Sequence, residues 1–206
     1  MRLFYGLSLP DFVLQETARI ARQSESLIAG RYSEVSNHHI TLAFLGEVPS
    51  ERLSDAERIL QKHAAAFPAP TLTLEIADYF GKPDNAILIL RVKSLPALDA
   101  LHDALIADCA QSGLSVDSGP FSPHITLARH AKTSPQTLAA LTPAPLSFSP
   151  ECAHVYVSAR DEQDILRYTP LFSAPFAKAE PLTYTGGNLC RLSGLPSDCF
   201  NKMWVY

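Results

Sequence analysis

The pentapeptide HITLA occupies residues 39–43 and occurs again, letter for letter, at residues 124–128. An identical match of this length arises by chance in on the order of one in a hundred chains of this size, so the repeat indicates an internal duplication. Both copies are short runs rich in apolar and β-branched residues, which are typical of strands. We predict two related lobes, each with one strand that presents a His-x-Thr face.

In a strand, residues two positions apart project from the same face, so His39 lies beside Thr41 and His124 beside Thr126. The isoleucine and leucine of each copy then point the other way, into a core. An imidazole and a hydroxyl that are buried without hydrogen-bond partners would cost free energy. The pattern therefore predicts that the two polar strand faces turn toward each other and line a cleft.

Two histidines on opposite walls of a cleft suit the opening of a cyclic phosphodiester. This reaction needs a base that takes a proton from water and an acid that protonates the departing ribose oxygen. The unperturbed pKa of histidine, about 6.5, allows one side chain to serve in each role. The hydroxyls of Thr41 and Thr126 can donate hydrogen bonds to the non-bridging phosphate oxygens. This chemistry requires no metal ion.

The other histidines lack a comparable motif. By strand parity, His38 points to the face opposite to that of its neighbour His39. His63, His102 and His154 lie in helix or strand contexts. His130 follows Arg129 just past the second copy and could border the site, although the stretch reads as a solvated loop. We predict structural or solvent-exposed positions for these five side chains.

Around the two copies, short apolar runs alternate with amphipathic stretches. Strands are predicted at residues 2–9, 40–46, 71–80, 86–92, 121–129, 146–150, 153–159 and 166–172. Helices are predicted at residues 11–28, 51–66 and 95–112. Ser50 is expected to cap the second helix and Gly113 to stop the third. The expected fold class is α+β.

The composition fits one soluble domain, because 206 residues at 47% hydrophobic can bury one substantial core. No apolar run approaches the roughly 18 residues of a membrane span, and the N-terminus does not read as a signal peptide. The four cysteines show no C-x-x-C pair or regular spacing, which fits a reducing, cytoplasmic compartment. A formal net charge of −4 argues against a long nucleic-acid footprint, so any such contact should be short and local.

Four longer strings extend the pattern beyond the repeat: RLFYGLSLP, NHHITLAFLGEV, GPFSPHITLAR and LRYTPL. With them the sequence resembles the two-histidine phosphoesterase superfamily, and specifically the RNA 2′,3′-cyclic phosphodiesterases, also called 2′-5′ RNA ligases. The resemblance implies two pseudo-symmetric lobes with antiparallel sheets around a V-shaped cleft and helices on the outside. It also implies hydrolysis of a terminal 2′,3′-cyclic phosphate to a 2′-phosphomonoester without metal or cofactor, with 2′-5′ ligation as the reverse reaction.

The resemblance ends near residue 177. We therefore expect residues 1–177 to form a single bilobal domain that acts as a monomer, without an obligate protein partner, on RNA ends or small nucleotides. Residues 178–206, rich in Gly, Pro, Ser and Cys, form an extension of unknown role.

Carried over residue by residue, the resemblance implies a quartet of two catalytic histidines and two phosphate-binding threonines: His39, His124, Thr41 and Thr126. It also implies that Phe44 stacks on the terminal base and that Arg129 lies near the phosphate or base. Strand parity disagrees, because each of these two residues is five positions from its motif histidine and should project from the other face. Their roles therefore need a bulge, a twist or the end of a strand.

Three other functions stay open on the sequence. The quartet reads a phosphate and not a base, so a small nucleotide such as ADP-ribose cyclic phosphate could be the substrate. A non-catalytic module for nucleotides or RNA ends could use the same residues, although binding needs only one hydrogen-bonding set. A zinc hydrolase is a weaker alternative, because neither motif has the neighbouring carboxylate of a pattern such as H-E-x-x-H.

Overall fold

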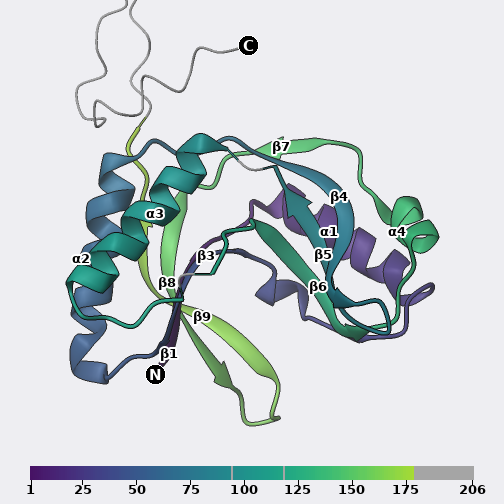
Figure 1. Ribbon diagram of the computed structural model, residues 1–206, viewed down its shortest axis with the longest axis horizontal. Coiled ribbons are helices and arrows are strands. Elements are labelled where there is room, and N and C mark those ends of the chain that lie inside the picture. Colours follow the sequence, from purple (N-terminus) through teal and green to yellow (C-terminus); the bar gives the residue numbers. More distant parts are fainter. Residues whose placement is uncertain (94, 118, 179–206) are drawn as a thin grey trace, which may run out of the picture.

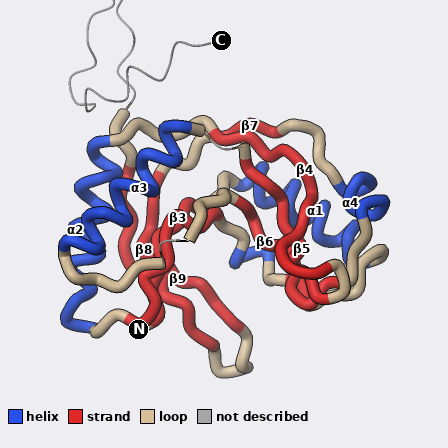
Figure 2. The backbone as a smooth tube through the Cα atoms, in the orientation of Figure 1, coloured by secondary structure: helices blue, strands red, loops and turns tan. Residues whose placement is uncertain are grey.

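The computed structural model describes residues 1–93, 95–117 and 119–178, and it shows two lobes that are each built on an antiparallel sheet (Figures 1 and 2). The sheet of lobe A has the order β3-β1-β8-β9, with bounds Ile40–Glu47, Arg2–Leu7, Cys152–Arg160 and Leu166–Pro175. The sheet of lobe B has the order β2-β6-β5-β4-β7, with bounds Arg31–Tyr32, His124–Ala131, Asn85–Val92, Leu72–Lys82 and Leu146–Phe148. The two HITLA copies thus lie at the starts of β3 and β6, one in each sheet.

The helices lie on the outer faces of the sheets (Figure 1). On lobe A, α2 (Leu53–Ala66) contacts β8 and β9 and packs on α3 (Pro96–Gln111), which also contacts β3. On lobe B, α1 (Asp11–Glu25) contacts β6, and α4 (Pro135–Leu141) contacts β4. This arrangement leaves the inner faces of the sheets to line a cleft, and it confirms the predicted α+β class with outer helices.

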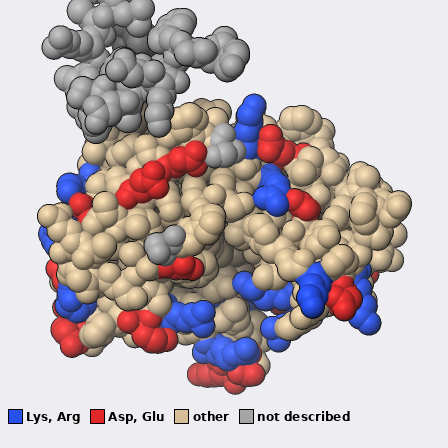
Figure 3. All heavy atoms as spheres, viewed as in Figure 1, with Lys and Arg blue, Asp and Glu red and all other residues tan. Residues whose placement is uncertain are grey.

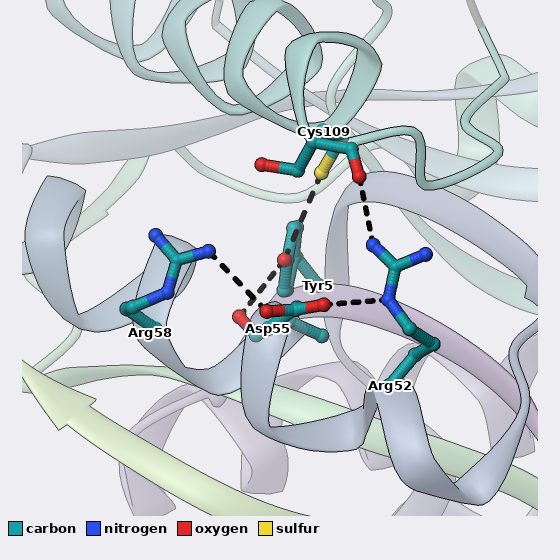
Figure 4. A network of polar contacts seen from close by, with 7 residues as sticks. Tyr5, Arg52, Asp55, Arg58 and Cys109 are labelled. Atoms are coloured by element: carbon teal, nitrogen blue, oxygen red, sulfur yellow. Dashed lines mark hydrogen bonds and ion pairs between the residues drawn. The ribbon is translucent and has the colours of Figure 1, made fainter.

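Strand β1 separates the core of lobe A from the cleft. Tyr5 is fully buried on the helix side, where its hydroxyl donates to the Ala56 carbonyl of α2 at 2.9 Å. Cys109 Sγ of α3 lies 3.7 Å from the same hydroxyl, and Figure 4 shows this tie beside the ion pair of Arg52 and Asp55. Burial raises the pKa of the Tyr5 phenol, so the hydroxyl keeps its proton and links one strand to two helices.

Gly113 ends α3 as predicted. Its φ of 69° lies in the left-handed region that glycine adopts without strain. The Leu114 N–H donates to the Cys109 carbonyl at 2.9 Å, and the Gly113 N–H donates to the Ala110 carbonyl at 3.0 Å. These two bonds form a Schellman motif, which satisfies the last carbonyls of the helix.

Several predicted boundaries were wrong. Ser50 does not cap α2, because it lies in a short 3-10 helix (Ser50–Arg52) and its hydroxyl contacts the Glu51 carboxylate. The first helix ends at Glu25, not at residue 28. Near this end the Ser24 hydroxyl donates to the Ile20 carbonyl, and such side-chain bonds to backbone carbonyls compete with the hydrogen bonds of the helix. The strand expected at 121–129 starts only at His124, because the proline before it has no N–H for a ladder.

Two elements, β2 and α4, were not predicted, since a two-residue strand and a seven-residue helix carry too little periodicity. In the described part of the chain, no helix is long and apolar enough to cross a membrane. Near the end of that part, the Ala177 N–H donates to the carbonyls of Ala64 at 3.0 Å and Phe67 at 3.1 Å. Apart from Lys178, the extension predicted at 178–206 lies outside the described residues.

Candidate active site

A cavity of about 240 Å³ opens between the lobes and is lined by residues of both sheets. The structure brings together there all six residues that the sequence singled out: His39, Thr41, Phe44, His124, Thr126 and Arg129. Five further residues, which were not predicted from the sequence, also line the cavity: Ser33, Asn37, Phe80, Ile87 and Tyr168. In Figure 3 the surface is hollowed between the lobes, and Lys and Arg side chains gather below the hollow.

Phe44 reaches the cavity because β3 contains a bulge. The register of β3 with β1 jumps between Thr41 and Ala43, so Leu42 is an extra residue on this strand. Leu42 and Ala43 are both buried, and the alternation of side chains restarts one position late. Phe44 is 44% exposed and projects from the same face as Thr41.

Strand β6 contains the same irregularity at the equivalent place. Its register with β5 jumps between Thr126 and Ala128, and both Leu127 and Ala128 are fully buried. Arg129 therefore turns to the cavity instead of the core. Both strands thus contain the bulge that strand parity required before Phe44 and Arg129 could share a face with the motif residues.

His39 is held by its own backbone. Its Nδ1–H donates to the Asn37 carbonyl at 2.7 Å, since a carbonyl can only accept. In the neutral ring Nε2 is then the acceptor, and the Thr41 hydroxyl, 2.9 Å away, donates to it. The edge of Tyr168 and the ring of Phe4 pack on the imidazole, with centroids 5.0 and 4.8 Å away.

His124 is held in the same way. Its Nδ1–H donates to the Ser122 carbonyl at 2.7 Å, again from the residue two positions earlier. Among the described residues Nε2 has no hydrogen-bond partner, and it is left toward the cavity. Phe80 packs edge-to-face on this imidazole, with the centroids 4.9 Å apart. Both rings thus have the tautomer that presents Nε2 to a ligand.

The residues that supply the two carbonyls are themselves fixed by their side chains. The Asn37 amide donates to the Leu166 carbonyl at 2.7 Å and accepts from the Tyr168 N–H at 3.0 Å, which ties it to β9. Ser122 Oγ accepts from Arg91 Nη1 at 3.1 Å, and Arg91 also pairs with Asp78. The signal in the sequence is a polar residue two positions before each motif histidine.

The environment lowers the pKa of both motif histidines. Burial lowers the pKa of His39 to about 4, with smaller contributions from the positive charges of His124 and Arg129, while the Asn37 carbonyl opposes them. Burial also has the largest effect on the pKa of His124 and lowers it. The charges of Arg129 and Arg91 lower this pKa further, while the hydrogen bond to the Ser122 carbonyl raises it. Without a bound anion both rings are neutral near pH 7, and a bound phosphate would raise both pKa values.

The other five histidines do not line this cavity, but His102 lines a neighbouring cavity that shares four of its residues, Thr41, Phe44, Phe80 and His124. His38 is buried on the opposite face of the strand, with Nδ1 2.9 Å from the Thr17 hydroxyl. His63 pairs with Asp108 at 2.9 Å. His130 is exposed, but it belongs to β6 and not to a loop, and its φ of 53° follows the bulge of that strand.

Gly6 leaves room for the His39 ring. A Cβ at this position would lie 3.1 Å from the Ile40 carbonyl oxygen, and 3.3 Å from ring carbons of both His39 and Phe4. We expect Gly6→Ala to shift the imidazole by a few tenths of an ångström and to lower turnover severalfold, because catalysis depends steeply on such positions. Steady-state kinetics on the folded variant would test this. An unchanged turnover number would show that catalysis tolerates a small displacement of the His39 imidazole.

A fold of two antiparallel sheets, in which each sheet contributes one His-x-Thr strand to a shared cleft, defines the class of two-histidine phosphoesterases. The sequence profile of the 2′-5′ RNA ligase superfamily matches residues 10–163. The chain belongs to this superfamily.

Individual relatives agree with this assignment. The RNA 2′,3′-cyclic phosphodiesterase of Escherichia coli (strain K12) is 33% identical over 131 residues, which are 63% of this chain and 72% of the relative. E. coli LigT complexed with 3′-AMP has a TM-score of 0.65 at 28% identity and covers 86% of this chain and 98% of its own. The protein TT0787 of Thermus thermophilus has a TM-score of 0.74 over 87% of this chain and 100% of its own, and at 23% identity it shows the fold alone.

Proposed function

We propose that this protein hydrolyses 2′,3′-cyclic phosphates at RNA ends to 2′-phosphomonoesters, by acid–base catalysis that needs no metal ion. The observation that carries the proposal is the matched pair of imidazoles. Each has Nδ1–H fixed on a backbone carbonyl, and both line one cavity. The name of the E. coli relative and the 3′-AMP complex of LigT support a nucleotide substrate.

In the proposed reaction, the cyclic phosphate lies between the two histidines. His39 Nε2 takes a proton from water as the water oxygen bonds to phosphorus. The bond from phosphorus to ribose O3′ breaks, and O3′ takes the proton of His124 Nε2–H. The Thr41 hydroxyl, which donates to His39 Nε2 in the structure, turns to a non-bridging phosphate oxygen and so frees that nitrogen for the water. The Thr126 hydroxyl donates to the second non-bridging oxygen, and the Arg129 guanidinium offsets the charge that these oxygens gain. With a 5′-hydroxyl in place of water as the nucleophile, the same two proton transfers would break the bond from phosphorus to O3′ and join two RNA ends through a 2′-5′ phosphodiester.

The assignment of base and acid follows from the surroundings. His39 is packed among aromatic rings and its pKa is lowered to about 4, so it is neutral and can accept a proton. His124 packs on one aromatic ring, that of Phe80, and its Nε2 has no hydrogen-bond partner among the described residues, so this nitrogen can carry the proton that a bound phosphate stabilises. Phe44 lines the cavity and is partly exposed, which supports the proposal that it stacks on the terminal base.

Activity should be greatest in mildly acidic solution. The base must be neutral and the acid protonated, so kcat/KM follows a bell-shaped curve between the two pKa values of the free enzyme. Because both are lowered from 6.5, one of them to about 4, we expect the maximum below pH 6.5. A pH profile measured well below KM tests this, and a maximum at pH 7.5 or above would contradict it.

Both histidines come from one chain, so we propose that residues 1–177 act as one bilobal catalytic domain and as a monomer. A cyclic phosphate on a small nucleotide such as ADP-ribose is the alternative substrate, because the proposed quartet recognises the phosphate and not the base. A binding module remains the non-catalytic alternative. No group of three or more His, Cys, Asp or Glu that could hold a metal occurs within the described ranges.

One experiment separates these functions. Purified protein would be incubated, with chelator present, with a short oligonucleotide and with ADP-ribose, each carrying a cyclic phosphate. We expect the oligonucleotide to be converted faster, to a product with a 2′-phosphate. Faster conversion of the ADP-ribose compound would support the small-nucleotide alternative, binding without turnover would support the module, and activity that only zinc restores would support a metal enzyme.

A further inference from the structure

Two arginines lie side by side at one end of the cleft. Arg31 of β2 is the register partner of Arg129 of β6 in an antiparallel pair. Residues directly opposite each other in such a pair project from the same face, with Cβ atoms about 5 Å apart. Like charges at this spacing repel each other, so the pair is destabilising unless an anion lies between or beside them.

Neither arginine is neutralised by a carboxylate within residues 1–93, 95–117 and 119–178. Throughout the described residues, six arginines form ion pairs: Arg19, Arg52, Arg58, Arg91, Arg160 and Arg167. No ion pair or hydrogen bond involves the side chain of Arg31 or Arg129 in that same part of the chain. The sequence has 21 acidic residues and a net charge of −4, yet no carboxylate of the described residues pairs with either of these adjacent guanidinium groups, of which Arg129 lines the cavity.

The two arginines differ in depth. Arg129 is half-buried, lines the cavity, and is close enough to lower the pKa of both motif histidines. Arg31 is exposed and lies outside the cavity lining. Ser33, two positions further along the chain, does line the cavity, so Arg31 continues the same face outward. An anion at Arg31 would therefore lie beyond the phosphate held between the histidines.

We propose that Arg31 binds a second phosphate of the RNA chain, the one that joins the terminal nucleotide to its neighbour. A nucleoside cyclic phosphate has no such group, whereas every longer RNA end has one. Arg31 then favours oligonucleotides over mononucleotides as substrates. This inference rests on the proposed function, because it assigns a substrate preference to the same site.

The test combines a protein variant with a neutral substrate linkage. Arg31→Gln removes the charge and keeps much of the side-chain length. Two dinucleotides with a terminal 2′,3′-cyclic phosphate would be compared, one with a phosphodiester and one with an uncharged methylphosphonate between the nucleosides. The matched control is Arg22→Gln, because Arg22 is also an exposed arginine without an ion pair in the described part.

We expect Arg31→Gln to lower kcat/KM about tenfold on the phosphodiester, the usual size of a charge-assisted contact, and to leave it unchanged on the methylphosphonate and on a mononucleoside 2′,3′-cyclic phosphate. The wild type and Arg22→Gln should discriminate between the two linkages about tenfold, and Arg31→Gln should not. Equal losses on both linkages, or no loss, would overturn the inference while leaving the proposed function intact. If the wild type converts none of the substrates, the proposed function fails and the inference fails with it.

Discussion

Replacing either motif histidine with alanine is expected to lower the turnover of a cyclic phosphate by about 10² to 10⁴, the usual contribution of one positioned acid or base. In the proposed mechanism each ring supplies one of the two proton transfers. Losses in the double variant should be far from additive, because once one partner is gone the other has lost its role. Thr41→Val and Thr126→Val should cost less, since each removes one hydrogen bond to phosphate.

The control for this prediction is His130→Ala, an exposed histidine outside the cavity lining. It should keep wild-type turnover. Circular dichroism would establish that all the variants are folded. Near wild-type rates in folded His39→Ala or His124→Ala protein would show that the paired-histidine mechanism is wrong.

Arg129→Gln is expected to lower kcat/KM by about tenfold to a hundredfold, because a guanidinium that contacts a phosphate contributes roughly 1.5 to 3 kcal/mol. It should also move the pH profile. The positive charge of Arg129 lowers the pKa of both His39 and His124, so its removal raises both values. The maximum of kcat/KM should therefore shift to higher pH.

Arg129→Lys is the matched variant, because it keeps the charge and loses the planar fork that binds two oxygens. It should lose activity but retain the wild-type pH profile. A profile that stays in place in Arg129→Gln as well would contradict the electrostatic role, even if activity fell.

The fold could be predicted largely from one feature, the repeated strand. The histidine and threonine side chains on two otherwise apolar strands need hydrogen-bond partners or water, and they have both if the two strand faces line a common cleft. The repeat therefore implies two sheets that share a cleft. Long periodic segments such as the third helix were also predictable, with Gly113 at the expected stop. The position of Ser50 in a 3-10 helix was not predictable, because a serine before an acidic residue suits an α-helix N-cap and a short 3-10 helix equally.

What the sequence could not predict depends on contacts between distant segments. The bulges that bring Phe44 and Arg129 to the cavity are set by pairing with β1 and β5, which strand parity within one segment cannot reveal. Asn37 binds backbone of β9, 129 residues further along the chain, and its role appears only once the fold is known. The like-charged neighbours Arg31 and Arg129 are likewise visible only through the register of β2.

The assignment of His39 as base and His124 as acid is tested most directly with a substrate whose leaving oxygen, O3′, is replaced by sulfur. A thiolate departs without protonation, because the pKa of a thiol, about 8.5, is far below that of a ribose hydroxyl. The measurement is the single-turnover rate of each alanine variant on this substrate relative to the oxygen substrate. The account predicts that the sulfur substrate restores a near wild-type rate to His124→Ala and leaves His39→Ala slow. Restoration of His39→Ala alone would reverse the assignment, and restoration of neither variant would contradict acid catalysis by these histidines.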